Sequence, residues 1–152
     1  MAQKRRLYLD TSVIGGFFDK EFMEKSNNLK QAVISGKYIV LISPLVFEEL
    51  EGAPEFVKKF VYSIKSVELV EIDKNILILR DSYLTSKVVS KNSIQDATHV
   101  ALATFARADA IVSWNFKHIV KLEKIKGFNE VNFRFGFGSI VIITPEGVSY
   151  ED

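Results

Sequence analysis

Short apolar runs rich in β-branched residues alternate with longer amphipathic stretches along the chain. Such runs are typical of buried strands, and stretches whose apolar residues recur every three or four positions are typical of helices. The alternation predicts a three-layer α/β/α sandwich with a mostly parallel central sheet, in a single domain of residues 1–152. We expect strands at 6–9, 38–42, 67–72, 110–113 and 139–143. We expect helices at 22–35, 44–51, 54–65 and 74–87, one from 93 to a tight connection at 108–109, and a short one ending within 121–127.

Capping and turn residues mark the boundaries of these elements. Ser43 followed by Pro44 predicts a helix start, with serine as the N-cap and proline in the first turn. Asp73 is expected to cap the helix that follows it. The glycine and aromatic residues of 133–138 predict a loop, and the Pro-Glu-Gly sequence at 145–147 predicts a turn.

The composition is that of an ordinary globular protein, with 47% hydrophobic and 26% charged residues. Because 20 Lys and Arg stand against 19 Asp and Glu, any binding of nucleic acid must rely on local patches. The absence of cysteine excludes disulfides and thiolate chemistry. The amino-terminal residues lack the apolar segment of a signal peptide, and no apolar run approaches the roughly 18 residues of a membrane span. We therefore expect a soluble cytoplasmic protein that does not associate with membranes.

Four polar residues fall where an open α/β sheet places its ligands, beyond the carboxyl ends of the strands. Asp10 follows the first strand, Glu49 lies on the helix after the second, Asp96 lies in the first turn of the late helix, and Asn115 follows the fourth strand. Singly, each has a structural explanation. The two aspartates could cap helices, Asp96 together with Ser93; the glutamate could belong to a solvated acidic face, and the asparagine to a turn. Their combination indicates one site.

The sequence resembles the PIN-domain family, metal-dependent nucleases that include the toxin subunits of VapBC toxin–antitoxin systems. The resemblance is carried in order by LYLDTSVI, SPLVFEEL, QDATHVALA and ADAIVSWNFKHIV, with a further likeness in GFGSIVIITPEGV. Together these motifs span nearly the whole chain. The resemblance implies a PIN-like sandwich and cleavage of single-stranded or loop RNA to 5′-phosphate and 3′-hydroxyl products. It also implies a Mg²⁺ or Mn²⁺ cofactor, a homodimer and, for a toxin, a cognate antitoxin protein.

When the family's functional positions are assigned to the matching residues of this chain, the resemblance implies that Asp10, Glu49 and Asp96 are the metal-binding and catalytic acids. Asn115 stands at the fourth catalytic position. Glu49 is chosen because an aliphatic residue follows it directly, and Glu48 is the second choice. Most members carry aspartate at the fourth position. An amide there lowers the charge by one and weakens the hold on a second metal, although its carbonyl can still ligate a cation or orient a water. A subgroup with a similar SWNFKHI stretch resembles this chain in that feature.

The chemistry of the residues supports the same assignment. Carboxylates about 4 Å apart repel by roughly 4 kcal/mol per pair at an effective dielectric near 20, so either a proton or a cation must offset the charge. Mg²⁺ or Mn²⁺ suits oxygen ligands and can activate water for attack on a phosphodiester. Zinc is disfavoured, because there is no cysteine and the two histidines lie far apart in sequence.

Other residues near these motifs have two interpretations each. Ser12 is either a supporting hydrogen-bond donor or a helix cap. His99, one turn after Asp96, either contacts substrate or packs within the fold. A set of lysines could contact RNA phosphates or form a solvated helix face. These are Lys117, Lys121, Lys124 and Lys126.

Three functions remain to be compared. The first is a metal-dependent ribonuclease of the PIN fold. The second is a non-catalytic PIN module that binds RNA or a protein, which the amide of Asn115 motivates. The third, a phosphatase of the haloacid dehalogenase type, would require an aspartate two residues after Asp10, where this chain has Ser12.

Overall fold

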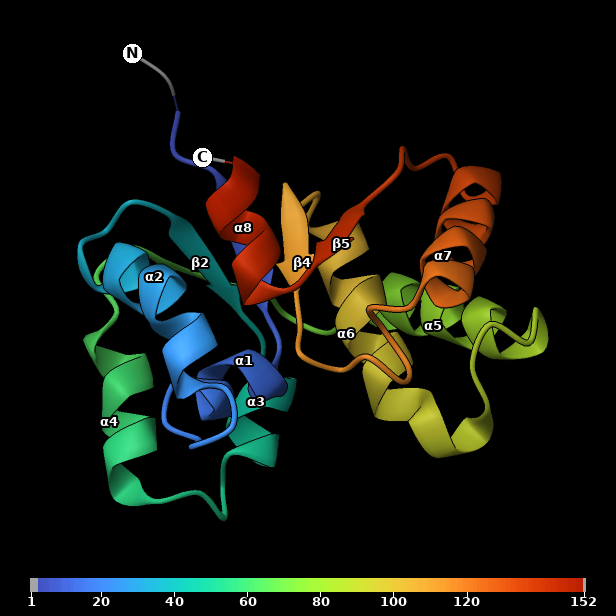
Figure 1. The fold of residues 1–152 in the computed structure, drawn as a ribbon. Helices are drawn as coiled ribbons and strands as arrows, with labels where there is room; N and C mark the ends of the chain where they lie inside the picture. Colours follow the sequence, from blue (N-terminus) through green and yellow to red (C-terminus); the bar gives the residue numbers. More distant parts are fainter. Residues whose placement is uncertain (1–2, 152) are drawn as a thin grey trace.

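The computed structural model describes residues 3–151, and its centre is a five-stranded sheet in which all neighbouring strands are parallel (Figure 1). The strand order is β3-β2-β1-β4-β5, so the first strand lies in the middle. The edge strand β3 is exposed along its length. The strands are β1 (Arg6–Leu9), β2 (Ile39–Ile42), β3 (Val67–Leu69), β4 (Ala110–Val112) and β5 (Val141–Ile143).

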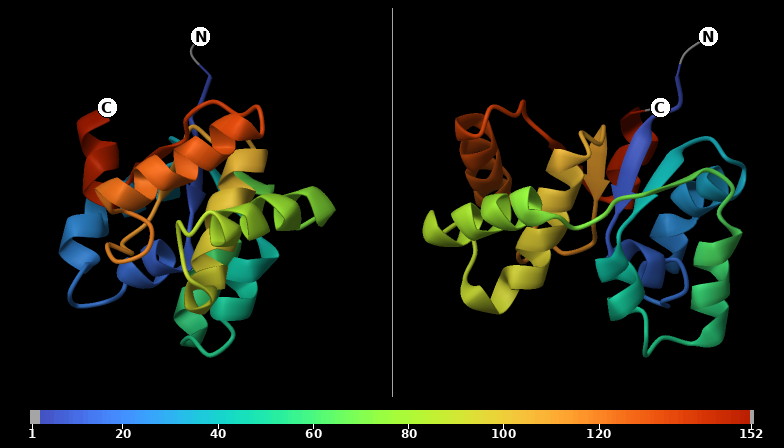
Figure 2. Two further views of the ribbon diagram at one scale, coloured as in Figure 1. Left: turned by 90° about the vertical axis from the view of Figure 1, so that its right-hand side faces the viewer. Right: turned by 180° about the vertical axis from the view of Figure 1, so that it is seen from behind.

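Helices cover both faces of this sheet, as Figures 1 and 2 show. One layer contains α1 (Thr11–Gly16), α2 (Met23–Ile34), α3 (Pro44–Glu49), α4 (Glu55–Ser63) and α8 (Pro145–Glu151). The other contains α5 (Lys74–Thr85), α6 (Ile94–Phe105), which follows the short 3₁₀ helix η1 (Lys91–Ser93), and α7 (Leu122–Arg134). The three-layer α/β fold with a parallel sheet is thus confirmed.

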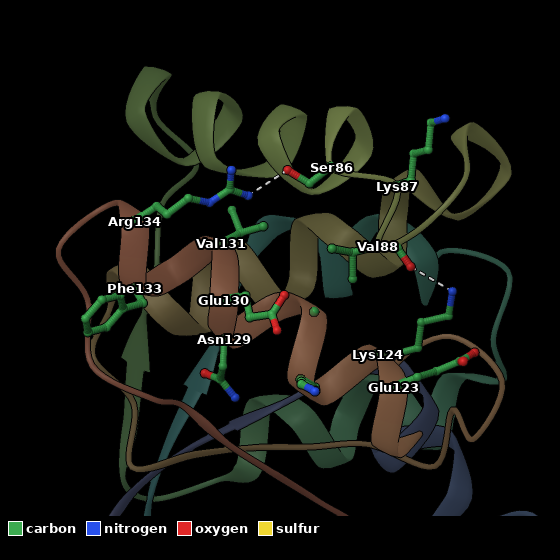
Figure 3. Close-up of a pocket in the computed structure, with 12 residues that line it drawn as sticks. Ser86, Lys87, Val88, Glu123, Lys124, Asn129, Glu130, Val131, Phe133 and Arg134 are labelled. Carbon is green, nitrogen blue, oxygen red and sulfur yellow. Dashed lines mark hydrogen bonds between the residues drawn. The ribbon is translucent and has the colours of Figure 1, made fainter.

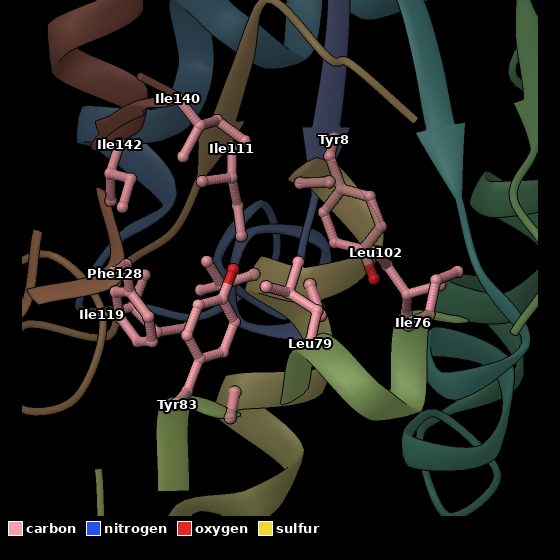
Figure 4. Packing of buried hydrophobic residues seen from close by; sticks show 14 of the residues in the cluster. Tyr8, Ile76, Leu79, Tyr83, Leu102, Ile111, Ile119, Phe128, Ile140 and Ile142 are labelled. Carbon is pink, nitrogen blue, oxygen red and sulfur yellow. The ribbon is translucent and has the colours of Figure 1, made fainter. Parts of the chain in front are cut away.

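The two helix layers bury opposite faces of the strands. Successive residues of a strand point to opposite sides, so the Tyr8 side chain packs toward α5, α6 and α7, whereas Leu7 and Leu9 pack toward the other layer. Tyr8 joins Leu79, Leu102 and other side chains in a core under α5 and α6 (Figure 4). Burial on both faces explains why the inner strands β1, β2 and β4 are almost continuous apolar runs, unlike the exposed β3.

Two expected N-caps have different outcomes. The Asp73 side chain accepts a hydrogen bond from the backbone N–H of Ile76 at 3.0 Å and caps α5, as predicted. Ser43 does precede the proline that starts α3, but its side chain makes no capping bond. The Ser43 hydroxyl is fully buried and lies 2.8 Å from the Tyr8 hydroxyl. A buried phenol needs a partner, and here it takes the serine that would otherwise cap the helix.

The prediction for the chain after residue 121 was wrong in two places. Helix α7 continues to Arg134, so the expected 133–138 loop begins two residues later than predicted, at residue 135. The helix continues because Phe128 and Val131 are buried in the core beyond the glycine at which we expected it to stop. Residues 145–147 begin the helix α8 instead of forming a turn. Its apolar residue Val148 is buried against the sheet, which stabilises a helix that its sequence alone does not indicate.

None of the helices within residues 3–151 is both long enough and apolar enough to cross a membrane.

Candidate active site

The pairing of β1 with β4 creates the candidate site. Leu9 is in register with Val112, so the residues that follow them, Asp10 and Ser113, meet at the carboxyl edge of the sheet. The Ser113 hydroxyl donates to Asp10 Oδ2 at 2.5 Å, and the Ser12 hydroxyl donates to Oδ1 at 2.6 Å. The backbone N–H of Val13 also donates to Oδ1, at 3.2 Å. Asp10 therefore both caps α1 and contributes a carboxyl group to the site.

Burial dominates the electrostatics of Asp10, which is only 3% exposed. Loss of solvent raises the pKa of its carboxyl group, and nearby His99 together with the hydroxyls of Ser113 and Ser12 opposes this rise in pKa only in part. The folded chain therefore binds a proton, or another positive partner, at Asp10 more readily than an exposed aspartate does.

Glu49 comes to the same place from the end of α3. Its Oε1 accepts hydrogen bonds from the Thr11 hydroxyl at 2.7 Å and from His99 Nε2 at 2.6 Å. Burial raises the pKa of the Glu49 carboxyl, but the hydrogen bond and charge of His99 and the hydroxyl of Thr11 outweigh it, so the pKa lies below its ordinary value. These contacts place Glu49, which we preferred to Glu48 in the sequence, beside α1 and α6.

His99 is 3% exposed and is bonded on both ring nitrogens. Since the ionised Glu49 accepts from Nε2, that nitrogen carries a proton. The other nitrogen, Nδ1, lies 2.7 Å from the Tyr8 hydroxyl, which also contacts Ser43. Burial raises the pKa of Tyr8, so the phenol stays protonated and forms a hydrogen bond with Nδ1. A buried chain of hydrogen bonds thus runs from Ser43 through Tyr8 and His99 to the Glu49 carboxylate.

Asp96 and Asn115 face each other across the same edge. Asn115 Nδ2 donates to Asp96 Oδ1 at 3.0 Å, and the Asn115 side-chain carbonyl accepts from the backbone N–H of His118 at 2.9 Å. The amide group therefore turns its N–H toward the carboxylate and its oxygen toward the turn that follows. In this arrangement Asn115 orients Asp96 by a hydrogen bond.

Asp96 lies within electrostatic range of the other two acids and of two histidines. Burial raises the pKa of Asp96, His118 and His99 lower it, and the charges of Asp10 and Glu49 raise it again. Like charges have this effect only at short range. Three carboxyl groups, from the junction of β1 with α1, from α3 and from α6, thus lie in one region.

A single tryptophan secures the loop between Ser113 and Asn115. The indole of Trp114 is buried, stacks on Phe22 with ring centroids 4.7 Å apart, and donates from Nε1 to the Ser26 hydroxyl at 2.9 Å. The backbone N–H of Trp114 donates to Ser12 Oγ at 2.9 Å. These contacts fix the residues on either side of Trp114 relative to α1 and α2.

The structure brings together all four residues of the expected quartet and places Ser12 beside Asp10. Lys117 lies on the exposed turn after Asn115, and Lys121 is exposed and paired with Glu123 at 3.2 Å. Sequence reasoning missed Ser113 and Tyr8. Ser113 could have been found, because it stands one residue past the strand that pairs with β1. Tyr8 carried no signal, since an aromatic residue in a central strand is ordinary core.

The donor set suits a hard divalent cation in its chemistry but is not a preformed cage. Carboxylate oxygens are what Mg²⁺ and Mn²⁺ prefer, and a cation would relieve the raised pKa of Asp10 and Asp96. Within residues 3–151, no three acidic, His or Cys side chains surround a common point closely enough to hold an ion. The residues therefore fit a Mg²⁺ that is held by one or two carboxylates and keeps several waters, as is common for this ion.

Among known proteins, this chain matches solved structures but neither family models nor curated sequences. No family model matches the sequence, and no curated protein matches it. Among solved structures, a chain in the crystal structure of VapBC2 from Rickettsia felis, bound to a DNA fragment from their promoter, is similar with a TM-score of 0.54. The sequences are 13% identical, and the match covers 91% of this chain and 98% of that chain. At this identity the likeness concerns the fold, and the chain therefore has a PIN-like α/β fold.

Proposed function

We propose that this protein is an endoribonuclease that depends on Mg²⁺ or Mn²⁺ and cleaves phosphodiester bonds of single-stranded or loop RNA. The observation that carries the proposal is the gathering of Asp10, Glu49 and Asp96 at the carboxyl edge of the sheet, each held there by hydrogen bonds from neighbouring side chains. Carboxyl groups gathered where α/β folds bind ligands, one of them buried and one half-buried, indicate a site for a cation and a phosphate.

Each residue has a distinct part in the proposed reaction. One or two of the carboxylates of Asp10, Glu49 and Asp96 would hold the cation, which when bound would supply an activated water and offset charge on the phosphoryl group. Ser12 and Ser113 orient the Asp10 carboxyl, and His99 orients that of Glu49. Asn115 orients Asp96 through its amide N–H. These hydrogen bonds hold the acids in position before substrate arrives, which reduces the reorganisation that binding requires.

The proposal extends to a role in a toxin–antitoxin pair. One structural neighbour is a chain in the structure of VapBC2 bound to promoter DNA, and the resemblance of the sequence motifs points to the toxin component of such systems. We therefore propose a cognate antitoxin protein as a partner and a homodimer as the assembled form. Light scattering at micromolar concentration tests the dimer, and a monomeric mass would contradict it.

Cleavage of end-labelled RNAs is the direct test of the enzyme. Wild-type protein should cut with Mg²⁺ or Mn²⁺ and be inactive in EDTA, and Asp96→Asn should abolish cutting with either metal. Glu48→Gln is a matched control on the same helix as Glu49, and it should retain activity. Equal cutting by wild type and Asp96→Asn would exclude this site as the source of the activity.

A second candidate, a non-catalytic module that binds RNA or protein, is favoured by one observation. The side-chain carbonyl of Asn115 is bonded to the backbone of His118 and is turned away from the acids. The Asn115→Asp variant distinguishes the two functions. If the wild type is inert with every metal but Asn115→Asp cuts RNA, the amide accounts for the loss of activity. If both are inert while the wild type still binds RNA, the module is the better description.

A further inference from the structure

A wide groove lies between the end of α5 and the helix α7, apart from the acidic site (Figure 3). Its volume is about 1070 Å³. One wall is formed by residues 86–88, just after α5, and the other by the exposed side of α7. At this size, in a protein of 152 residues, the groove can accommodate a ligand much larger than an ion.

Positive charge predominates along the groove. Four cationic side chains line it, against the two acids Glu123 and Glu130. Glu123 is itself paired with Lys121 at 3.2 Å, so Glu130 is the acid that most directly opposes an anion there. The cations come from both walls, so an anion in the groove would have cations on two sides. They are Lys87, Lys124, Lys126 and Arg134.

Two of these cations are held by hydrogen bonds that cross the groove, drawn as dashed lines in Figure 3. Lys124 Nζ donates to the backbone carbonyl of Val88 at 2.7 Å, and the Arg134 guanidinium donates to the Ser86 hydroxyl at 2.8 Å. Each still has further N–H donors. Because these side chains are already ordered, binding an anion costs less conformational entropy than it would with free lysines.

An exposed aromatic side chain adds a second kind of contact. Phe133 lines the groove and is 79% exposed, although a phenylalanine is normally buried. Cations that follow a phosphate backbone, combined with an exposed ring on which a base can stack, form the usual surface for single-stranded nucleic acid.

Chain connectivity relates both walls to the candidate site. The segment after residue 88 leads through η1 into the start of α6, which carries Asp96. The turn that follows Asn115 leads directly into α7. With 13 residues rising about 1.5 Å each, α7 is about 20 Å long and matches roughly six nucleotides stacked at about 3.4 Å.

We propose that this groove binds the phosphate backbone of the single-stranded RNA substrate, outside the acidic site, with Phe133 stacking on one base. The assignment rests on the proposed ribonuclease function for the identity of the ligand. The groove determines how firmly and over what length the RNA is held, and the acids determine whether it is cut.

Fluorescence anisotropy with a labelled single-stranded RNA tests the assignment in EDTA, where cleavage does not interfere. Lys87→Gln and Lys126→Gln should each raise the Kd, by about fivefold near 0.1 M salt, and lower the slope of log affinity against log salt by about 0.7. Glu130→Gln should strengthen binding. Phe133→Ala should weaken it without changing the salt slope. Lys59→Gln, on α4 in the opposite layer, is the matched control and should leave the Kd unchanged.

The outcomes separate the groove from the catalytic proposal. If the groove variants alter RNA binding as expected but no metal supports cleavage, the groove assignment stands and the ribonuclease proposal fails. If cleavage occurs and the groove variants bind RNA like the wild type, the groove assignment is overturned. It is also overturned if Lys126→Gln weakens binding of a labelled poly-glutamate peptide but not of RNA, because the groove then serves an acidic protein segment.

Discussion

Gly15 and Gly16 are neighbours in α1, yet they have different surroundings. A methyl group added at Gly15 would meet no atom within 4 Å apart from its chain neighbours and the backbone of its own helix. One added at Gly16 would lie 2.8 Å from Trp114 Cδ1 and 2.9 Å from Trp114 Nε1. The indole cannot move aside freely, because it is stacked on Phe22 and bonded to Ser26. Gly16→Ala should therefore displace either α1 or the loop that carries Ser113 and Asn115.

We expect Gly15→Ala to raise the free energy of unfolding, whereas overpacking should lower it in Gly16→Ala. Replacing glycine by alanine within a helix stabilises it by up to about 1 kcal/mol, so Gly15→Ala should raise the free energy of unfolding by about 0.5–1 kcal/mol. Overpacking in a core destabilises by about 1–3 kcal/mol, and this opposes the same helix gain in Gly16→Ala. We expect the two variants to differ by about 1–3 kcal/mol, or by about 2–12 °C in Tm for a chain of this size.

Urea unfolding followed by tryptophan fluorescence measures this difference directly. Trp114 is the one tryptophan in the sequence, so its emission reports both unfolding and the local environment of the indole. Gly15→Ala should keep the native emission maximum, and Gly16→Ala should shift it and reduce RNA cleavage. Identical unfolding midpoints and emission spectra for the two variants would refute the close contact between α1 and Trp114.

Three further predictions concern the site. Tyr8→Phe leaves Nδ1 of buried His99 without its hydrogen-bond partner and should lower the free energy of unfolding by about 1–3 kcal/mol in urea unfolding. The control Tyr62→Phe, whose ring is 77% exposed, should change it by less than about 0.5 kcal/mol. In EDTA, the raised pKa of Asp10 means that the folded chain holds its proton more tightly than the unfolded chain. The free energy of unfolding should therefore fall as the pH rises above the ordinary aspartate range, and Asp10→Asn should flatten that fall in unfolding curves across pH; an unchanged slope would contradict the role of Asp10. Mg²⁺ at about 100 times its Kd should raise the free energy of unfolding of the wild type by about 2.7 kcal/mol in calorimetry, and a gain as large in Asp96→Asn would exclude that carboxylate as a ligand.

The sequence by itself determined the fold class, because its short continuous apolar runs and its apolar residues spaced every three or four positions depend only on local geometry. The same patterns located the ends of β1 and β4, and hence the places of Asp10 and Asn115. Local patterns predicted the wrong structure in two places. Near residue 127 the helix α7 continues because Val131 is buried, and at 145–147 the helix α8 forms because Val148 is buried. Tertiary packing outweighs helix propensity at such positions.

The partners of each site residue were decided only by the tertiary structure. No local pattern indicates that His99 lies between Tyr8 and Glu49, or that Ser113 donates to Asp10, since these pairs are far apart in the chain and meet through the order of the strands. The orientation of the Asn115 amide likewise depends on the backbone of His118. Hydrogen bonds act over about 3 Å and depend on direction, so they follow from the packed arrangement of the elements, whereas the elements themselves follow from the spacing of apolar residues.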